Sequence, residues 1–206
     1  MGVIKTDFSL LKPASIGKGA FGAKTTELAR FKDAFEKKGI VTPPHVSLSV
    51  DFFHNVLFRA GLVKEDGSYV FSAFTGHRIL SKEEIKFNKR ELTVLRAIFN
   101  RFQDYVVAIR SDERTAKGIG LYDTGFMLAL NSSDKFNLFL DKIKTILLCQ
   151  SDRSALAFVG RVGLPHGIGI QFMPLVAFHN TKNNSLFPLI SIAGFTAKDS
   201  DKILFH

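Results

Sequence analysis

The chain has 206 residues, of which 46% are hydrophobic and 23% charged, and its formal net charge is +9. This length is enough for one large domain or two small ones with a buried core, and the composition is that of an ordinary globular protein. No run approaches the ~18 consecutive apolar residues of a membrane span, and the one cysteine, Cys149, excludes an internal disulfide. We therefore expect a cytoplasmic protein with a buried, unreactive thiol.

The positive charge raises the question of nucleic-acid binding. Lysine and arginine are scattered singly along the polar faces of expected helices, as at Lys82, Lys86 and Lys89, with no run of five or more. The aromatic and basic signature of an RNA-binding module is also missing. A solvated surface that attracts polyanions such as ATP explains the charge equally well, so we treat nucleic-acid binding as an alternative and not as the main interpretation.

Local patterns predict the elements of the first half. Leu28, Phe31 and Phe35 recur at helical spacing, and a Lys-Lys-Gly stop follows. Ser81 and Glu84 form a capping box that predicts the start of a longer helix through Phe102. The expected elements are a helix over 23–38, a strand over 46–48, a helix over 51–60, a polar hairpin or loop over 62–80, a helix over 81–102 and a strand over 105–109.

The second half is richer in strand patterns. Residues 111–119 are polar and predict a loop, and Ser133 or Asp134 is expected to cap a helix that continues to Leu148. The other expected elements are a strand over 126–130, a short helix over 151–162, strands over 167–178 and 186–196, and an apolar strand-like tail over 203–206. Helices early and antiparallel strands late predict an α+β fold. We expect a single domain over 1–206, with possible sub-lobes 1–104 and 105–206, and interpret the tail as a domain cut short.

The glycine-rich segment 16–25 is the most informative motif, because three nucleotide-binding patterns partly match it. Gly17, Gly19 and Gly22 satisfy G-x-G-x-x-G. A Rossmann fingerprint requires a preceding strand, which Pro13 disfavours in a central position, and an acidic residue about 20 positions further on. A protein kinase requires its lysine close behind the loop, whereas Val107-Ala-Ile-Arg110 comes far later. A P-loop requires lysine directly after the last glycine, and Lys24 is one residue late.

A fourth interpretation of this segment remains. Lys24 falls in the first turn of the following helix, and helix N-termini bind anions. Lys24 is therefore either a phosphate-binding lysine or an ordinary surface lysine at a helix start, and this segment alone favours the second.

Six short motifs, in order, resemble the pyruvate phosphate dikinase and phosphoenolpyruvate synthase family. The segment 21–31 (FGAKTTELARF) resembles "GGKxxxLAxL", 39–48 (GIVTPPHVSL) resembles "GipVPpGfvit", and 107–111 (VAIRS) looks like "vaVRSS". The segment 120–124 (GLYDT) looks like "AGqyeTfL", 170–176 (IQFMPLV) resembles "vVQkMV", and 193–196 (AGFT) resembles "sGvaFT". Each motif is weak alone, and their shared order over residues 16–200 makes the resemblance fairly specific.

The resemblance implies the N-terminal, ATP-grasp-type nucleotide-binding domain of a phosphotransferase. Such enzymes use ATP and Mg²⁺ and pass phosphate through a phosphohistidine domain towards pyruvate or another acceptor. By this resemblance Lys24 and Arg110 hold phosphate oxygens, while Gly120, Thr124 and Gly125 lie along the nucleotide. Gln171 contacts the adenine side, or is simply a polar residue on the outer face of a strand.

The sequence departs from that family in two places. Residues 112–119 are shorter than the family's acidic loop and contain Arg114 and Lys117. The family's magnesium ligands and phosphohistidine lie beyond residue 206, so no metal ligand, catalytic residue or catalytic histidine is assigned here. We therefore expect weak nucleotide binding and no catalysis from this span alone, with a partner chain or further domains carrying the phosphohistidine. The alternatives are a non-catalytic regulatory or assembly module and a basic nucleic-acid-binding domain.

Overall fold

The computed structural model describes residues 11–39, 44–68, 81–114, 124–127, 135–149, 167–175, 177–180, 185–188, 194–196 and 203–205. The chain divides into two compact units, Met1–Pro174 and Leu175–His206. The boundary expected between sub-lobes, at residues 104 and 105, lies inside the first unit. The fold is mixed α+β, as predicted.

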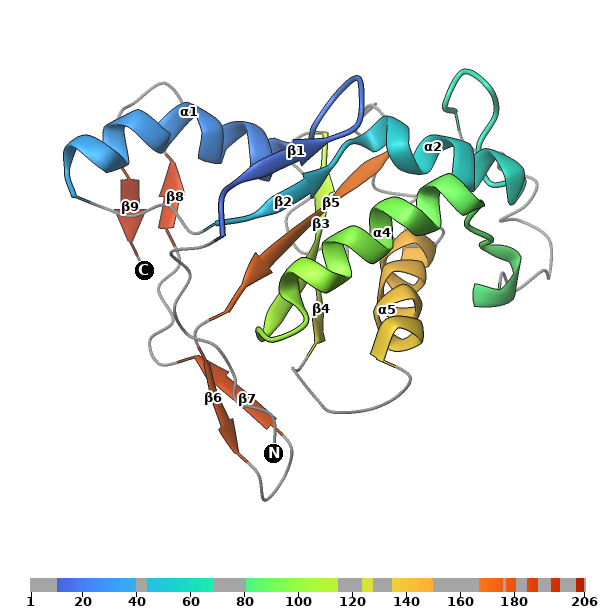
Figure 1. Ribbon diagram of the computed structural model, residues 1–206. Helices are drawn as coiled ribbons and strands as arrows, with labels where there is room; N and C mark the ends of the chain where they lie inside the picture. Colours follow the sequence, from blue (N-terminus) through green and yellow to red (C-terminus); the bar gives the residue numbers. More distant parts are fainter. Residues whose placement is uncertain are drawn as a thin grey trace. The chain divides into compact units, whose positions relative to one another are not determined.

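The first unit contains a five-stranded sheet with helices on it (Figure 1). Its strands are β1 (Ala14–Ile16), β2 (Val46–Leu48), β3 (Val107–Glu113), β4 (Thr124–Met127) and β5 (Ile168–Pro174). Its helical elements are α1 (Ala23–Lys37), α2 (Val50–Arg59), the 3₁₀ turn η1 (Lys82–Glu84), α4 (Lys89–Phe102) and α5 (Lys135–Cys149). The second unit has two antiparallel strand pairs, β6 (Ala177–Asn180) with β7 (Ser185–Pro188) and β8 (Gly194–Thr196) with β9 (Ile203–Phe205).

The sheet runs in the order β1-β2-β5-β3-β4. Among the described strand pairs of this sheet, only β1 and β2 are parallel, and α1 lies between them in the chain, so the three elements form a βαβ unit. The strand β1 follows Pro13 directly and lies at the edge of the sheet, where a proline is tolerated. The glycine segment therefore does follow a strand, although a short edge strand and not a central one.

The two faces of the sheet differ in chemistry. Val46, Leu48, Ile109, Ile170 and Phe172 are fully buried on one face, beneath α2, α4 and α5. Phe139 of α5 lies 5.4 Å, ring to ring, from Phe172 and joins a cluster of phenylalanines that fills this core. On the other face, Ser47, Asp112 and Gln171 are buried polar residues that meet the first turn of α1. Alternation along the strands thus separates an apolar core from a polar layer.

The structure corrects three element boundaries. The Ser81 capping box forms but opens only η1, and α4 begins at Lys89, because Asn88 and Glu91 make a second capping box. Residues 111–113, expected in a loop, continue β3. The region expected as a strand over 167–178 is divided into β5 and β6. The predicted helix over 151–162 and the cap at Ser133 or Asp134 lie outside the described residues.

Candidate functional site

The glycine segment forms a tight connection between β1 and α1 that packs on the start of α2. Gly17 and Gly19 have φ values of 114° and 80°, which other residues rarely adopt. A side chain at Gly17 would overlap Ser49, and one at Gly19 would overlap Asp51. The backbone amide of Ser49 donates a hydrogen bond to the carbonyl oxygen of Ile16, and that of Val50 donates to the carbonyl oxygen of Ala20, each at 3.0 Å. The first two glycines are thus required by backbone shape and close packing, and are more than a flexible connection.

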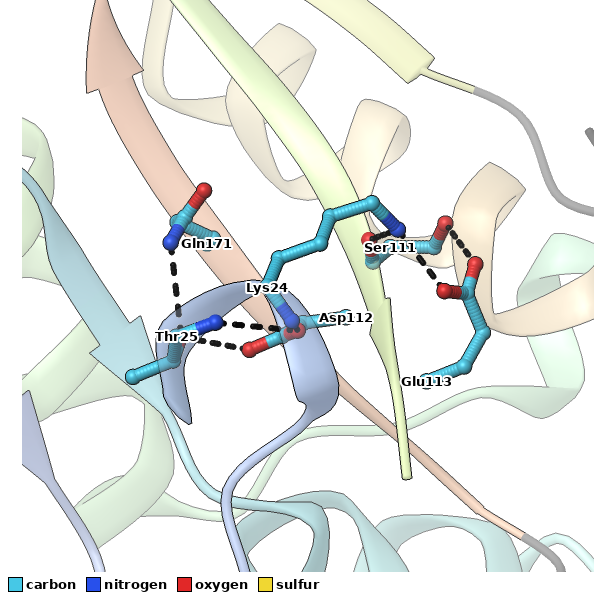
Figure 2. Close-up of polar contacts among 6 residues, drawn as sticks. All are labelled: Lys24, Thr25, Ser111, Asp112, Glu113 and Gln171. Atoms are coloured by element: carbon cyan, nitrogen blue, oxygen red, sulfur yellow. Dashed lines mark hydrogen bonds and ion pairs between the residues drawn. The ribbon is translucent and has the colours of Figure 1, made fainter. Parts of the chain in front are cut away.

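The start of α1 is capped by a carboxylate from a distant strand (Figure 2). Gly22, the N-cap residue, has no side chain to accept the free amides of the first turn. Instead, Oδ1 of Asp112 accepts the backbone amide of Lys24 at 2.9 Å and that of Thr25 at 3.4 Å. Asp112 is completely buried. Its negative charge therefore lies at the positive end of the helix dipole, in the position that a bound anion would otherwise take.

The hydroxyl of Thr25 joins this carboxylate to the polar layer of the sheet. Thr25 Oγ1 donates to Asp112 Oδ2 at 2.5 Å. Because a hydroxyl has one proton to donate, Thr25 Oγ1 then accepts from the hydroxyl of Ser47 at 2.7 Å. Gln171 Nε2 also donates to Thr25 Oγ1, at 3.4 Å. Gln171 is fully buried, and its Oε1 has no hydrogen-bond partner among the described residues. Because an unpaired buried acceptor is costly, this oxygen is suited to receive a donor from a bound molecule.

Burial raises the pKa of the Asp112 carboxyl above its ordinary value. The hydrogen bonds from Thr25 and Lys24, together with the positive charge of Lys24, act in the opposite direction and do not outweigh this desolvation. The carboxylate is thus held in a place where its ionised form is disfavoured.

The side chain of Lys24 is also held by β3. Its ammonium Nζ donates to the carbonyl oxygen of Ser111 at 2.6 Å and to Glu113 Oε2 at 2.7 Å. The hydroxyl of Ser111 fixes the other oxygen of Glu113 at 2.9 Å. The side chain of Lys24 is 31% exposed and that of Glu113 13% exposed, so solvent reaches this ion pair although it does not reach Asp112.

Strand register brings most of the predicted binding residues together. Arg110 on β3 lies opposite Gln171 on β5 and opposite Thr124 on β4, and Gly125 is the partner of Ile109. Arg110 is half-buried and has no hydrogen-bond or ion-pair partner among the residues that the structure describes. The start of α1, with Lys24, meets β3 at Asp112, two residues along the strand from Arg110. Gly120 lies outside the described residues.

Sequence reasoning missed Thr25, Ser47, Asp112 and Glu113. Asp112 and Glu113 were placed in a polar loop, although Ala108, Arg110 and Asp112 already alternate as residues of one strand face do. Extending that alternation would have marked Asp112 as a buried polar position. Nothing local would have paired it with α1, because 88 residues separate Lys24 from Asp112.

A second concave feature lies at the start of α2. It is a cavity of about 450 Å³ whose walls include the apolar Val50, Leu57 and Ile168 and the carboxylates of Asp51, Glu65 and Asp66. Within the described parts of the chain, no group of three or more His, Cys, Asp or Glu side chains is placed to hold a metal ion. None of the predicted binding residues that the structure describes lines this cavity.

Comparison of the chain with protein-family models, with curated proteins and with solved structures found no match. Among the described helices, none has the length and apolar character needed to cross a membrane.

Proposed function

We propose that this chain is a nucleotide-binding domain of the ATP-grasp type, from a phosphotransferase similar to phosphoenolpyruvate synthase or pyruvate phosphate dikinase. The observation that carries the proposal is the register of β3 and β5, which sets Arg110 of β3 beside Gln171 of β5. The strand β3 also contacts the start of α1, through Asp112. A cationic fork and an unpaired buried acceptor, side by side in one sheet, fit a ligand with an anionic and a hydrogen-donating part. ATP has both, in its phosphates and in its amino and hydroxyl groups.

Each residue has a definite part in this proposal. The planar guanidinium of Arg110 pairs with phosphate oxygens in a bidentate manner. Gln171 Oε1 accepts a hydrogen bond from the nucleoside, while Thr25 fixes the other end of its amide. Lys24 adds a point charge to the phosphates once its ammonium is available. Thr124 and Gly125, on the neighbouring strand β4, border the same region.

Phosphoryl transfer depends mainly on positioning and on neutralising charge, and both functions are shared here with groups outside the described residues. Mg²⁺ bound with ATP would neutralise charge on the phosphates, and we propose that its carboxylate ligands come from a further domain or a partner chain. The same applies to the phosphohistidine that would receive the phosphate. The chain by itself is then a weak ATP-binding unit without turnover, acting in the cytoplasm.

Isothermal titration with Mg-ATP tests this proposal. We expect weak binding by the natural chain and a loss of about tenfold or more with Arg110→Ala, since a lost charge-assisted hydrogen bond is worth about 1.5–3 kcal/mol. Arg30→Ala is the matched control, because Arg30 is 64% exposed on α1 and its removal changes the net charge equally. Equal affinities of the two variants would overturn the assignment of Arg110.

A second candidate function is favoured by one observation. Asp112 accepts hydrogen bonds from the amides at the start of α1, and Glu113 pairs with the ammonium of Lys24. Such contacts are expected of a module that has the same fold but no longer binds the ligand. A non-catalytic regulatory or assembly module predicts that Mg-ATP produces no heat of binding in any of these variants. Nucleic-acid binding predicts instead an affinity that falls steeply with salt and that ATP does not compete away.

A further inference from the structure

We propose that Glu113, together with Asp112, is an internal competitor for nucleotide phosphates at the start of α1. This inference rests on the proposed nucleotide site and concerns what limits phosphate binding there. Two carboxylates, adjacent in the chain, occupy the two groups of this helix start that would attract a phosphate. Asp112 accepts the free amides of the first turn, and Glu113 holds the ammonium of Lys24.

The two carboxylates differ in burial and in the groups that they bond. Asp112 is buried, accepts two backbone amides and a hydroxyl, and is packed against Gly22, so it is a fixed part of the helix cap. Glu113 is partly exposed and makes its contacts to Lys24 at the edge where solvent enters. Only Glu113 can turn away without leaving buried amides unpaired. It is therefore the group that yields when a phosphate approaches Lys24.

The unpaired Oε1 of Gln171 is a second and independent sign that this region is made for a ligand. The amide nitrogen of Gln171 reaches Thr25, in the same first turn that Asp112 caps, while its oxygen has no partner within the part of the chain that the structure describes. In this proposal, the chain's own carboxylates occupy the phosphate-binding groups at the start of α1, while Gln171 Oε1 is left for another part of the nucleotide.

The competitor predicts that neutralising Glu113 raises phosphate affinity. In Glu113→Gln the shape is kept and Ser111 still has an oxygen to bond, while the charge that holds Lys24 is lost. Glu36→Gln is the control, because Glu36 is 57% exposed, lies on α1 with Lys24 and carries the same charge as Glu113. With inorganic pyrophosphate as the probe, we expect Glu113→Gln to bind about twofold to fivefold more tightly than Glu36→Gln, since an ion pair that solvent reaches is worth up to about 1 kcal/mol.

The gain must also depend on Lys24. Adding Lys24→Met to Glu113→Gln should remove the extra affinity, whereas Lys24→Met in the natural chain should change pyrophosphate binding little. Equal affinities of Glu113→Gln and Glu36→Gln would overturn the proposal, as would a gain that survives Lys24→Met. Glu113→Ser serves as a second neutral variant, and thermal unfolding of each protein establishes that folded chains are compared.

The two proposals fail in different ways. If Mg-ATP binds in an Arg110-dependent manner and Glu113→Gln adds nothing, the nucleotide site stands and the competitor is wrong. If pyrophosphate binding increases through Lys24 and Mg-ATP binding does not depend on Arg110, the competitor stands and the nucleotide assignment is wrong.

Discussion

Gly22 packs directly against Asp112: a Cβ atom at this glycine would overlap both the carbonyl oxygen and the carboxyl group of Asp112. The φ of Gly22 is −73°, which any residue adopts, so its conformation does not require glycine. What requires it is the close approach of α1 to β3. The last glycine of the segment is thus kept for a contact between two elements far apart in the chain.

The first prediction follows from this contact. Gly22→Ala should lower the free energy of unfolding by about 1–3 kcal/mol, the usual cost of overpacking a close contact. Gly39→Ala is the comparison, because Gly39 has a φ of 70° and a Cβ there meets nothing within 4 Å. It should cost about 1 kcal/mol through backbone strain alone. Urea unfolding of both variants measures the difference, and a neutral Gly22→Ala would contradict the packing described.

The second prediction concerns pH. Because the pKa of Asp112 is raised in the folded chain, the folded state binds a proton more tightly than the unfolded state, in which the value is near 3.8. The contribution of Asp112 to stability is therefore fully present below that value and is lost as pH rises through the raised, folded pKa. Asp112→Asn should remove this falling component from a plot of unfolding free energy against pH.

Asp66 supplies the opposite sign as an internal control. The hydroxyl and the amide of Ser68 bond its carboxylate and lower its pKa. Its contribution is therefore present above the unfolded value and lost as pH falls through the folded one. Asp66→Asn should therefore reduce the loss of unfolding free energy that accompanies a fall in pH. An Asp112→Asn curve parallel to that of the natural chain would show that this carboxyl does not titrate differently on folding.

The third prediction compares an ion pair whose carboxylate is buried with a pair in which both side chains are exposed. Glu91 is 7% exposed, and its two oxygens accept from Arg59 Nη2 at 2.9 and 2.6 Å while it also bonds the amide of Asn88. Arg59→Ala leaves this carboxylate buried without its cation and should cost about 1–3 kcal/mol. Lys82→Ala breaks an exposed pair with Asp141 and should cost less than about 1 kcal/mol. Similar losses in chemical unfolding would contradict the burial of Glu91.

The fourth prediction tests the orientation of α5. Phe139 is fully buried among Phe99, Phe136 and Phe172, whereas its neighbour Leu138 is 51% exposed. Phe139→Ala should cost about 3–5 kcal/mol, as expected for a large side chain removed from a packed core. Leu138→Ala should stay within about 0.5 kcal/mol. If the two losses were reversed in thermal or urea unfolding, α5 would be rotated relative to the sheet.

Elements with a strong local signal were predicted from the sequence. The helices α1 and α2 and the strand β2 have bounds within about two residues of those expected, because periodicity, caps and breakers are local. The start of α4 was wrong for an instructive reason. Two capping boxes follow one another, at Ser81 and at Asn88, and local rules do not say which one opens the longer helix.

The site was only partly predictable, because its defining contacts are long-range. The pattern around Lys24 correctly indicated a helix start, but the amides of that turn bond to Asp112, which was assigned to a loop. Conversely, the position of Arg110 beside Gln171 depends on the register between β3 and β5, which no local pattern in either segment specifies. Whether these groups bind ATP stays a prediction, to be decided by the titrations described above.

The place of β5 in the sheet has a consequence for the order of folding. This strand lies between β2 and β3, so Ser47 pairs with Gln171, which is more than 120 positions later. On a ribosome adding about 5–20 residues per second, the pair β1–β2 emerges about 6–24 s before β5, and the pair β3–β4 about 2–8 s before it. Until then, two open strand edges are exposed to other chains. The central position of β5 therefore predicts slow folding, because the sheet is completed only by pairing between segments far apart in the chain.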